Sequence, residues 1–220
     1  SQKVLISAVM ANAETIGDWL NGGDGIDIQG SNCLPTLKSI AFVSWTKRLG
    51  QLQYLDQDNV TDSGYFVPRV IEKMNLGVRG AERKERFFPV KSTVSSVAAY
   101  LGVKLCHQGP VAIFCGAKKS VVTISEHLVD SYRRGLDIAR PSEKSDVSEL
   151  DKMANLAALH FENKTIFPDA IRLGVLPHSS NIPNGLRVSV EWAMERSKGC
   201  LVVCTSTLAQ GVNLPIKYLI

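Results

Sequence analysis

Apolar runs and amphipathic stretches alternate along this chain of 220 residues. Residues 4–9, 110–115 and 201–203 are short, apolar and rich in β-branched side chains, which is typical of strands buried on both faces. Strands that alternate with amphipathic helices predict an α/β fold with a parallel sheet flanked by helices. Apolar positions at helical spacing predict these helices in the stretches 12–20, 92–102, 121–135, 146–161 and 183–194.

Residues with strong capping preferences mark the ends of three of these helices. Ser92 is expected to cap the helix that follows it, and Gly102 is expected to end that helix. Asp146 followed by Glu149 predicts a capping-box-like start for the helix at 146–161. Pro183 fits the first turn of the last predicted helix, because proline needs no hydrogen-bond partner there.

The region before residue 92 has a different pattern. Residues 37–45 and 49–55 predict two strands that form a hairpin, because their connection is short. Residues 56–91 are polar and show no sustained period, so an irregular insertion is expected there. Its basic residues stand beside Phe87 and Phe88, which suits single-stranded nucleic acid. A solvated loop tethered by two buried phenylalanines is the interpretation that we favour, because runs of charge usually face water.

Composition narrows the class of protein only slightly. The net charge of +4 permits a polyanionic partner without requiring one. The five cysteines form no CxxC pair and have no metal-ligand spacing, so we expect reduced, buried thiols and no metal site. No apolar run approaches the length of a membrane span and no secretory signal opens the sequence, so a cytoplasmic, intracellular protein without a membrane partner is expected.

The stretch 199–220 carries the most informative chemistry. Thr205, Ser206 and Thr207 follow a predicted buried strand directly, at its carboxyl end. Ligands bind at that end of the strands in open parallel sheets, and hydroxyls with backbone N–H groups on such a turn can bind phosphate. Gly211 allows a close approach of the backbone, and Asn213 offers donors and acceptors to a sugar or a base.

Four segments resemble motifs of superfamily-two helicases, in particular the DExH group that includes the Ski-like enzymes. TSTLAQGVNLP, from Thr205, resembles motif V, with Asn213 where DEAD-box relatives have aspartate. LISAVMANAETIGDWLNG, from residue 5, resembles motif III, with Val9 in place of threonine. Residues 116–120 resemble motif IV, and residues 174–180 resemble a GVxxHH segment in which Ser179 replaces the second histidine. The order of these matches along the chain agrees with the order in the family.

The resemblance implies a division into RecA-like lobes and assigns roles to individual residues. Residues 1–21 would end a first lobe, and residues 22–220 would form a second lobe that is incomplete at its C-terminus, with the polar insertion at about 56–91. The resemblance places these residues at nucleic acid: Gly116, Lys118, Thr205, Ser206, Thr207 and, in strand contact or packing, His178. It places these at the nucleotide or in its coupling to the strand: Ser7, Ala8, Gly211 and Asn213.

By the same resemblance, the full-length parent would be an ATP-dependent helicase or translocase that uses ATP and Mg²⁺. Its partner would be DNA or RNA, single-stranded or a tailed duplex. This sequence has no GxxxxGK[ST], no DExH and no arginine-rich motif VI, so no catalytic residue is expected in it and this chain alone is expected to be inactive. Two alternatives stay open: a non-catalytic nucleic-acid-binding module with a helicase-like lobe, and an unrelated Rossmann-like enzyme.

Overall fold

The structure is a computed structural model that describes residues 13–23, 26, 39–47, 49–55, 63–162, 164–208 and 214–220. The strand predicted at 4–9 lies outside these residues. Helix α1 (Ala13–Asn21) confirms the short helix expected after residue 12, and its Trp19 side chain is exposed. Within the described part of the chain, no helix combines the length and the apolar character that crossing a membrane requires.

The central sheet is parallel and has four strands in the order β7-β8-β6-β9. The strands are β6 (Val111–Phe114), β7 (Val175–His178), β8 (Leu201–Cys204) and β9 (Tyr218–Leu219). All four residues of β7 and of β8 are buried, which explains why β8 reads as an unbroken apolar run. The parallel α/β fold predicted from the sequence is confirmed, and it is consistent with a RecA-like lobe.

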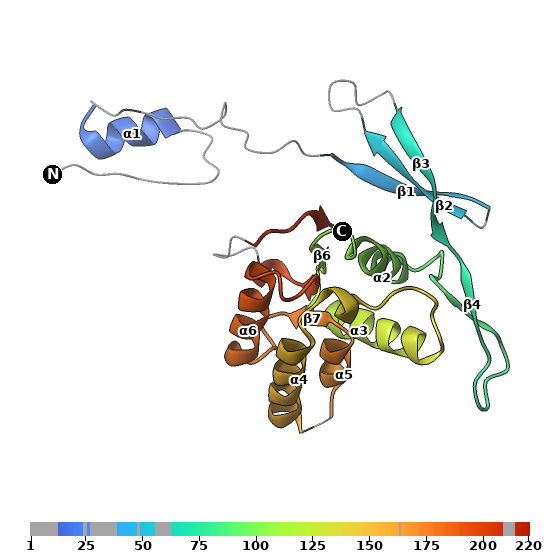
Figure 1. The fold of residues 1–220 in the computed structure, drawn as a ribbon. Helices are drawn as coiled ribbons and strands as arrows, with labels where there is room; N and C mark the ends of the chain where they lie inside the picture. The colour runs from blue at the N-terminus through green and yellow to red at the C-terminus, as the bar shows by residue number, and fades with distance from the viewer. Residues whose placement is uncertain are drawn as a thin grey trace.

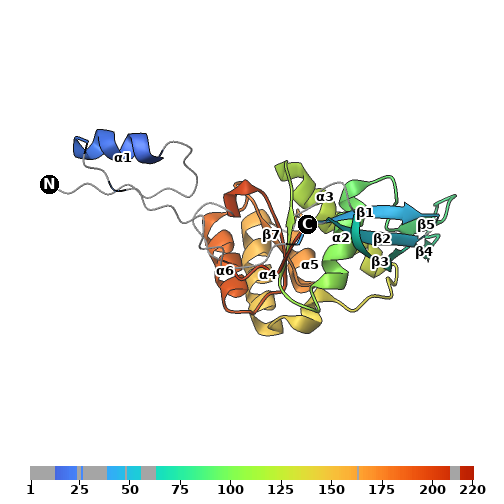
Figure 2. The same ribbon diagram turned by 90° about the horizontal axis from the view of Figure 1, so that it is seen from above.

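Helices α2 to α6 lie around this sheet (Figures 1 and 2). They are α2 (Val94–Leu105), α3 (Lys118–Arg133), α4 (Val147–Phe161), α5 (Phe167–Arg172) and α6 (Asn184–Glu195), with short 3₁₀ helices at Pro141–Lys144 and Ser206–Leu208. The apolar faces that the periodicity predicts are buried in α3 and α6, among them Leu128 and Val190. Helical periodicity therefore locates the core-facing sides of these helices correctly.

The predicted ends of helix α2 are wrong on both sides. The N-cap is Thr93, and Ser92 lies one residue outside it. Gly102 does not end the helix, which continues to Leu105. A Cβ atom on Gly102 would lie within 3.0 Å of the Ile113 side chain, so this glycine serves the close approach of helix to sheet. Glycine inside a helix otherwise costs about 1 kcal/mol, which is why it is usually interpreted as a stop.

The start of helix α4 agrees with the prediction at Asp146, but the Glu149 half of the capping box is not formed, because the Asp146 N–H donates to the Lys198 carbonyl at 2.9 Å. Asp146 is the N-cap, and its carboxylate accepts hydrogen bonds from the backbone N–H groups of Ser148 and Glu149 at 3.1 and 3.3 Å. The Glu149 carboxylate itself lies 3.0 Å from the Lys152 ammonium. The cap is thus supplied by the aspartate.

The region before α2 is a second, antiparallel layer. Strands β1 (Ala41–Thr46) and β2 (Leu49–Leu55) form the predicted hairpin, and β3 (Ser63–Glu72) pairs with β2. A separate two-stranded pair follows, β4 (Met74–Gly77) with β5 (Arg86–Phe88). The expectation of an irregular insertion at 56–91 is therefore wrong where β3, β4 and β5 lie, and residues 56–62 are outside the described part of the chain. The loop with two buried phenylalanines is also corrected, because Phe87 and Phe88 belong to β5 and only Phe88 is fully buried.

Polar contacts attach this antiparallel layer to helix α2. The backbone N–H of Glu72 donates to the Tyr100 hydroxyl at 3.3 Å, and the Lys104 ammonium donates to the carbonyl of Val70 at 2.6 Å. Ile71, between these two contacts on β3, is completely buried. The end of β3 therefore belongs to the core of the lobe, while residues 65–69 of the same strand are exposed.

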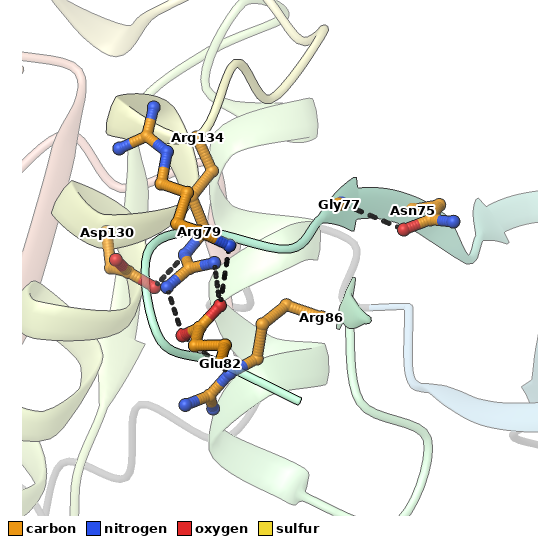
Figure 3. A network of polar contacts seen from close by, with 7 residues as sticks. All are labelled: Asn75, Gly77, Arg79, Glu82, Arg86, Asp130 and Arg134. Carbon is orange, nitrogen blue, oxygen red and sulfur yellow. Dashed lines mark hydrogen bonds and ion pairs between the residues drawn. The ribbon is translucent and has the colours of Figure 1, made fainter. Parts of the chain in front are cut away.

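The turn between β4 and β5 is held against the end of helix α3 by a set of ionic contacts that we call the hairpin clamp (Figure 3). Arg134 donates to both carboxylate oxygens of Glu82, at 2.9 and 2.7 Å, and to Asp130 at 2.8 Å. Glu82 also accepts from the backbone N–H of Arg79 at 3.1 Å, and the Arg79 guanidinium donates to the carbonyl of Arg133. Bidentate pairing fixes the geometry as well as the charge.

Acid should open the hairpin clamp. The hydrogen bonds from Arg134, and then the one from the Arg79 backbone, lower the pKa of Glu82 from 4.5 to about 2. A carboxylate with a lowered pKa stabilises the fold above its unfolded pKa and loses this contribution as the pH falls towards the folded value. We therefore expect amide hydrogen exchange between β4 and β5 to accelerate as the pH falls from 4.5 to about 2, after correction for the intrinsic rate.

The matched control is Glu82→Gln, which keeps the shape of the side chain and cannot titrate. This variant should exchange faster already at neutral pH and show no further loss of protection in that acid range. An identical pH profile for both proteins would mean that another group controls the turn.

Candidate nucleic-acid interface

The carboxyl ends of three parallel strands meet along one edge of the central sheet, which we call the carboxyl edge. Cys204 of β8 is in register with Phe114 of β6 on one side and with His178 of β7 on the other. Backbone hydrogen bonds continue past the strands, from Cys115 N–H to Cys204 O at 2.7 Å and from Thr205 N–H to His178 O at 3.1 Å. The segments that follow these strands therefore start side by side.

This edge brings together the described residues that sequence reasoning placed at nucleic acid. They come from the turn after β6 and the start of α3, from the end of β7, and from the turn after β8: Gly116, Lys118, His178, Thr205, Ser206 and Thr207. Their common location follows from the parallel topology, and their roles stay predictions. Ser7, Ala8, Gly211 and Asn213, predicted to serve the nucleotide, lie outside the described residues.

Three of these residues are open to solvent. Gly116, Lys118 and Ser206 are exposed, and a Cβ atom on Gly116 would meet no other atom within 4 Å. Lys118 is the first residue of the 16-residue helix α3, and its N-cap Ala117 has no side-chain oxygen to accept from the first N–H groups. Unpaired N–H groups and the helix dipole make such an N-terminus attractive to anions. An anion at this position would meet these N–H groups, and Lys118 is the first residue of the same helix.

The other three residues form a chain of hydrogen bonds behind this surface. The hydroxyls of Thr205 and Thr207 lie 3.1 Å apart, and the Thr207 hydroxyl lies 3.5 Å from Nδ1 of His178. Nε2 of His178 lies 2.7 Å from the carboxylate of Glu191 on α6. An ionised carboxylate can only accept, so Nε2 carries the hydrogen, and in the neutral ring Nδ1 then accepts from Thr207.

Burial bears on the two roles predicted for His178, strand contact and packing, and both stay predictions. The residue is 0% exposed, so its ring does not reach the surface of this structure, and the packing role fits it better than strand contact. Thr205 is also buried, at 7% exposed, and its hydroxyl contacts Thr207. Of the three hydroxyls, only that of Ser206 belongs to an exposed residue.

Sequence reasoning did not find Glu191. Its neighbours Val190, Ala193 and Met194 form the buried face of α6, and the glutamate stands at the margin of that face. The sequence did contain a signal for this contact. Glu191 stands beside the apolar face of a predicted helix, and that helix follows a strand that ends in histidine. Confirming the pair requires knowledge that α6 packs on β7.

Two thiols lie directly behind the carboxyl edge. Burial raises the pKa of Cys115, and burial together with the neighbouring Cys115 raises the pKa of Cys204 to about 12. Both therefore stay protonated near neutral pH and are poor nucleophiles. The prediction of reduced, buried thiols is confirmed for the four described cysteines, and Cys33 lies outside the described residues. In the part of the chain that the structure describes, no three His, Cys, Asp or Glu side chains gather as metal ligands would.

Comparison with known proteins links this lobe to helicase-related proteins. No family model matches the chain. The chain is 22% identical to the Hachiman protein HamB of Bacillus cereus over 221 aligned residues, which cover 100% of this chain and 19% of that protein. It is 29% identical to the helicase POLQ-like of Homo sapiens over 111 residues, which cover 49% of this chain and 9% of the human protein.

The chain thus spans less than a fifth of the length of the curated relatives it matches. The similarity supports a relation to helicases, since the human relative is named as one. It agrees with the helicase resemblance of the sequence motifs at the level of the broad class.

Proposed function

We propose that this chain contributes the second RecA-like lobe of an ATP-dependent helicase or translocase of superfamily two, in its Ski-like branch. In this proposal the carboxyl edge holds the sugar–phosphate backbone of a single strand of DNA or RNA. Residues 1–21 would belong to the end of the first lobe. The nucleotide cycle would close and open the cleft between the two lobes and so shift the grip on the strand.

The observation that carries the proposal is the composition of the carboxyl edge. One ammonium (Lys118), one exposed hydroxyl (Ser206) and the N-terminal N–H groups of α3 are all groups that bind phosphate oxygens. Gly116 leaves open space beside them, so a strand can approach the main chain closely. Phosphate contacts carry no sequence information, which suits a protein that moves along a strand.

The part of ATP and Mg²⁺ in this proposal rests on the sequence resemblance alone. The four residues that it assigns to the nucleotide, Ser7, Ala8, Gly211 and Asn213, lie outside the described residues. The contribution of the described residues is therefore derived without the nucleotide: they hold a phosphate backbone and keep the turn that holds it in place.

Replacing Lys118 with alanine tests the backbone grip. We expect single-strand affinity to fall about two- to fivefold, because an exposed ion pair contributes up to about 1 kcal/mol. The fall should be the same for oligonucleotides of different sequence. The slope of log K against log salt should decrease by about 0.7, the value for one lost phosphate contact on a single strand. Fluorescence anisotropy with labelled oligonucleotides over a salt series measures both quantities.

The matched control is Lys164→Ala, which removes another exposed lysine, located after helix α4. This control should change neither the affinity nor the slope. A loss confined to particular sequences, or an unchanged salt slope, would contradict a backbone grip at Lys118.

A further inference from the structure

A cavity of about 620 Å³ lies between the β4–β5 pair and helices α2 and α3, and we call it the hairpin hollow. It is separate from the carboxyl edge: His127, in its wall, stands nine residues after Lys118 on helix α3. At a rise of 1.5 Å per residue, this is about 14 Å along the helix. The side chains that line it are those of Lys73, Leu76, Glu85, Arg86, Phe87, Phe88, Val90, Lys91, Ser92, Ser96, His127, Asp130 and Ser131.

Two lysines of the hairpin hollow are held over aromatic rings. The Lys73 ammonium lies 3.9 Å from the centre of the Phe87 ring, and the Lys91 ammonium lies 5.6 Å from the centre of the Trp45 ring. Among the described residues, neither ammonium has a carboxylate within ion-pairing distance. A cation–π contact positions the charge but leaves it un-neutralised. Both ammonium groups can therefore still bind an anion.

Positive charge predominates in the hollow after internal pairs are counted. Asp130 is occupied by Arg134 of the hairpin clamp, and Glu85 is exposed. Arg86 lies 3.4 Å from Glu82, whose two oxygens already accept from Arg134. A guanidinium has five N–H donors, so Arg86 keeps donors for a ligand. Three cations thus face one uncommitted carboxylate, that of Glu85.

The backbone that carries these cations is held in place on two sides. The hairpin clamp fixes the turn between β4 and β5 to helix α3 (Figure 3). On the other side, the Ser96 hydroxyl on α2 accepts a hydrogen bond from the backbone N–H of Val90 at 2.8 Å. The hollow is therefore formed before a ligand arrives, which lowers the entropy cost of binding.

We propose that the hairpin hollow binds phosphates of a single nucleic-acid strand, as a second contact beside the carboxyl edge. The inference rests on the proposed function for the nature of the partner. Lys73 and Lys91 neutralise phosphates, Arg86 donates to their oxygens, and the Ser92 hydroxyl can add a hydrogen bond. The volume lies in the range of small-ligand sites and admits about one or two nucleotides, whereas a duplex is too wide for it.

The aromatic rings act as positioning residues in this proposal. Phe87 is half-buried in β5, and its ring faces the Lys73 ammonium. Trp45 stands in the same relation to Lys91. Because each ring limits the freedom of the lysine above it, less conformational entropy is lost when a phosphate binds.

The length of the bound strand provides the test. The double variant Lys73→Ala/Lys91→Ala should weaken binding of an oligonucleotide of about 20 nucleotides by about tenfold, from two exposed charge contacts. It should lower the salt slope by about 1.4, twice the value of one contact. Binding of an oligonucleotide of about four nucleotides, which fills the carboxyl edge alone, should not change. Lys84→Ala, which removes an exposed lysine of the same hairpin outside the hollow, is the matched control and should behave as wild type.

Comparison with Lys118→Ala separates this inference from the proposed function. If Lys118→Ala weakens both oligonucleotides while the double variant weakens neither, the hollow is not a strand site and this inference fails alone. If the double variant weakens binding of the long oligonucleotide while Lys118→Ala has no effect, the proposed strand contact at the carboxyl edge is wrong and the one in the hairpin hollow is supported. If neither oligonucleotide binds, both proposals fall.

A photo-crosslink identifies the contact directly. An oligonucleotide of about 20 residues containing 4-thiouridine should crosslink to a peptide from residues 85–92 or to His127, and the crosslink should disappear in the double variant. The assignment to nucleic acid would be overturned if the oligonucleotide gave no crosslink while an acidic peptide or a free nucleotide of equal charge bound the hollow. Unchanged thermal unfolding of the double variant would confirm that the lost contacts, and not misfolding, cause the effect.

Discussion

Replacing Gly174 with alanine is expected to lower the free energy of unfolding by about 3 kcal/mol or more. Gly174 precedes β7 and has a φ of +89°, a conformation that costs a residue with a side chain about 1–3 kcal/mol. A Cβ atom there would also lie within 3.0 Å of backbone atoms of Pro141 and Ser142. Overpacking against rigid backbone adds about 1–3 kcal/mol. Chemical unfolding of the variant measures the loss.

Two other glycines separate these two causes. Gly135 also has a positive φ, +87°, but open space around its Cβ position, so Gly135→Ala should cost about 1 kcal/mol. Gly185 lies in helix α6 with open space and no positive φ, so Gly185→Ala should be neutral or stabilise by up to about 1 kcal/mol. Equal losses at Gly174 and Gly135 would show that the 3₁₀ helix at 141–144 moves aside without cost.

The sequence predicts well those elements whose burial is uniform. Strand β8 and the first three residues of β6 are buried apolar runs, and the pattern of apolar residues is enough to recognise them. Strand β7 is equally buried but contains Pro177 and His178, residues that the pattern does not associate with a central strand. It stands at the edge of the sheet order, where proline is tolerated because one side of the strand needs no donor.

The antiparallel layer shows where local pattern is insufficient. Strand β3 contains Pro68 and is exposed at residues 65–69, and β4 and β5 are only four and three residues long. Their existence depends on pairing partners and on the hairpin clamp, in which Glu82 and Arg134 are 52 residues apart. A contact at that separation leaves no periodic signal in the sequence, so the pattern of residues 56–91 predicts a polar loop.

The candidate site also has a part that the sequence predicts and a part that it does not. That the hydroxyls of residues 205–207 and the turn at Gly116 share one edge follows from parallel topology, which the sequence indicates. That His178 and Thr205 are buried, and that Glu191 supports them, depends on how α6 packs on β7. Composition and spacing cannot specify this packing, because the same residues on a differently placed helix would face water.

Replacing Glu191 with alanine is therefore expected to weaken the turn that holds the proposed phosphate site. The change leaves Nε2–H of the buried His178 without its acceptor at 2.7 Å. An unsatisfied buried polar group costs about 1–3 kcal/mol, and the lost partner is charged, so we expect a loss near the upper end of this range. The hydroxyls of Thr207 and Thr205 then lose the fixed ring that orients them. Amide hydrogen exchange at residues 205–208 and chemical unfolding measure the two consequences.

Glu191→Gln is the matched control, since the amide oxygen can still accept from Nε2–H and the side chain keeps its size. It should retain all but about 1 kcal/mol of the stability and most of the protection of the turn. If the network positions the phosphate-binding turn, single-strand affinity should fall in Glu191→Ala and recover in Glu191→Gln. A loss of stability in Glu191→Ala with unchanged strand affinity would show that the buried chain from Glu191 to Thr205 is purely structural. The grip would then depend on Lys118, Ser206 and the end of α3 alone.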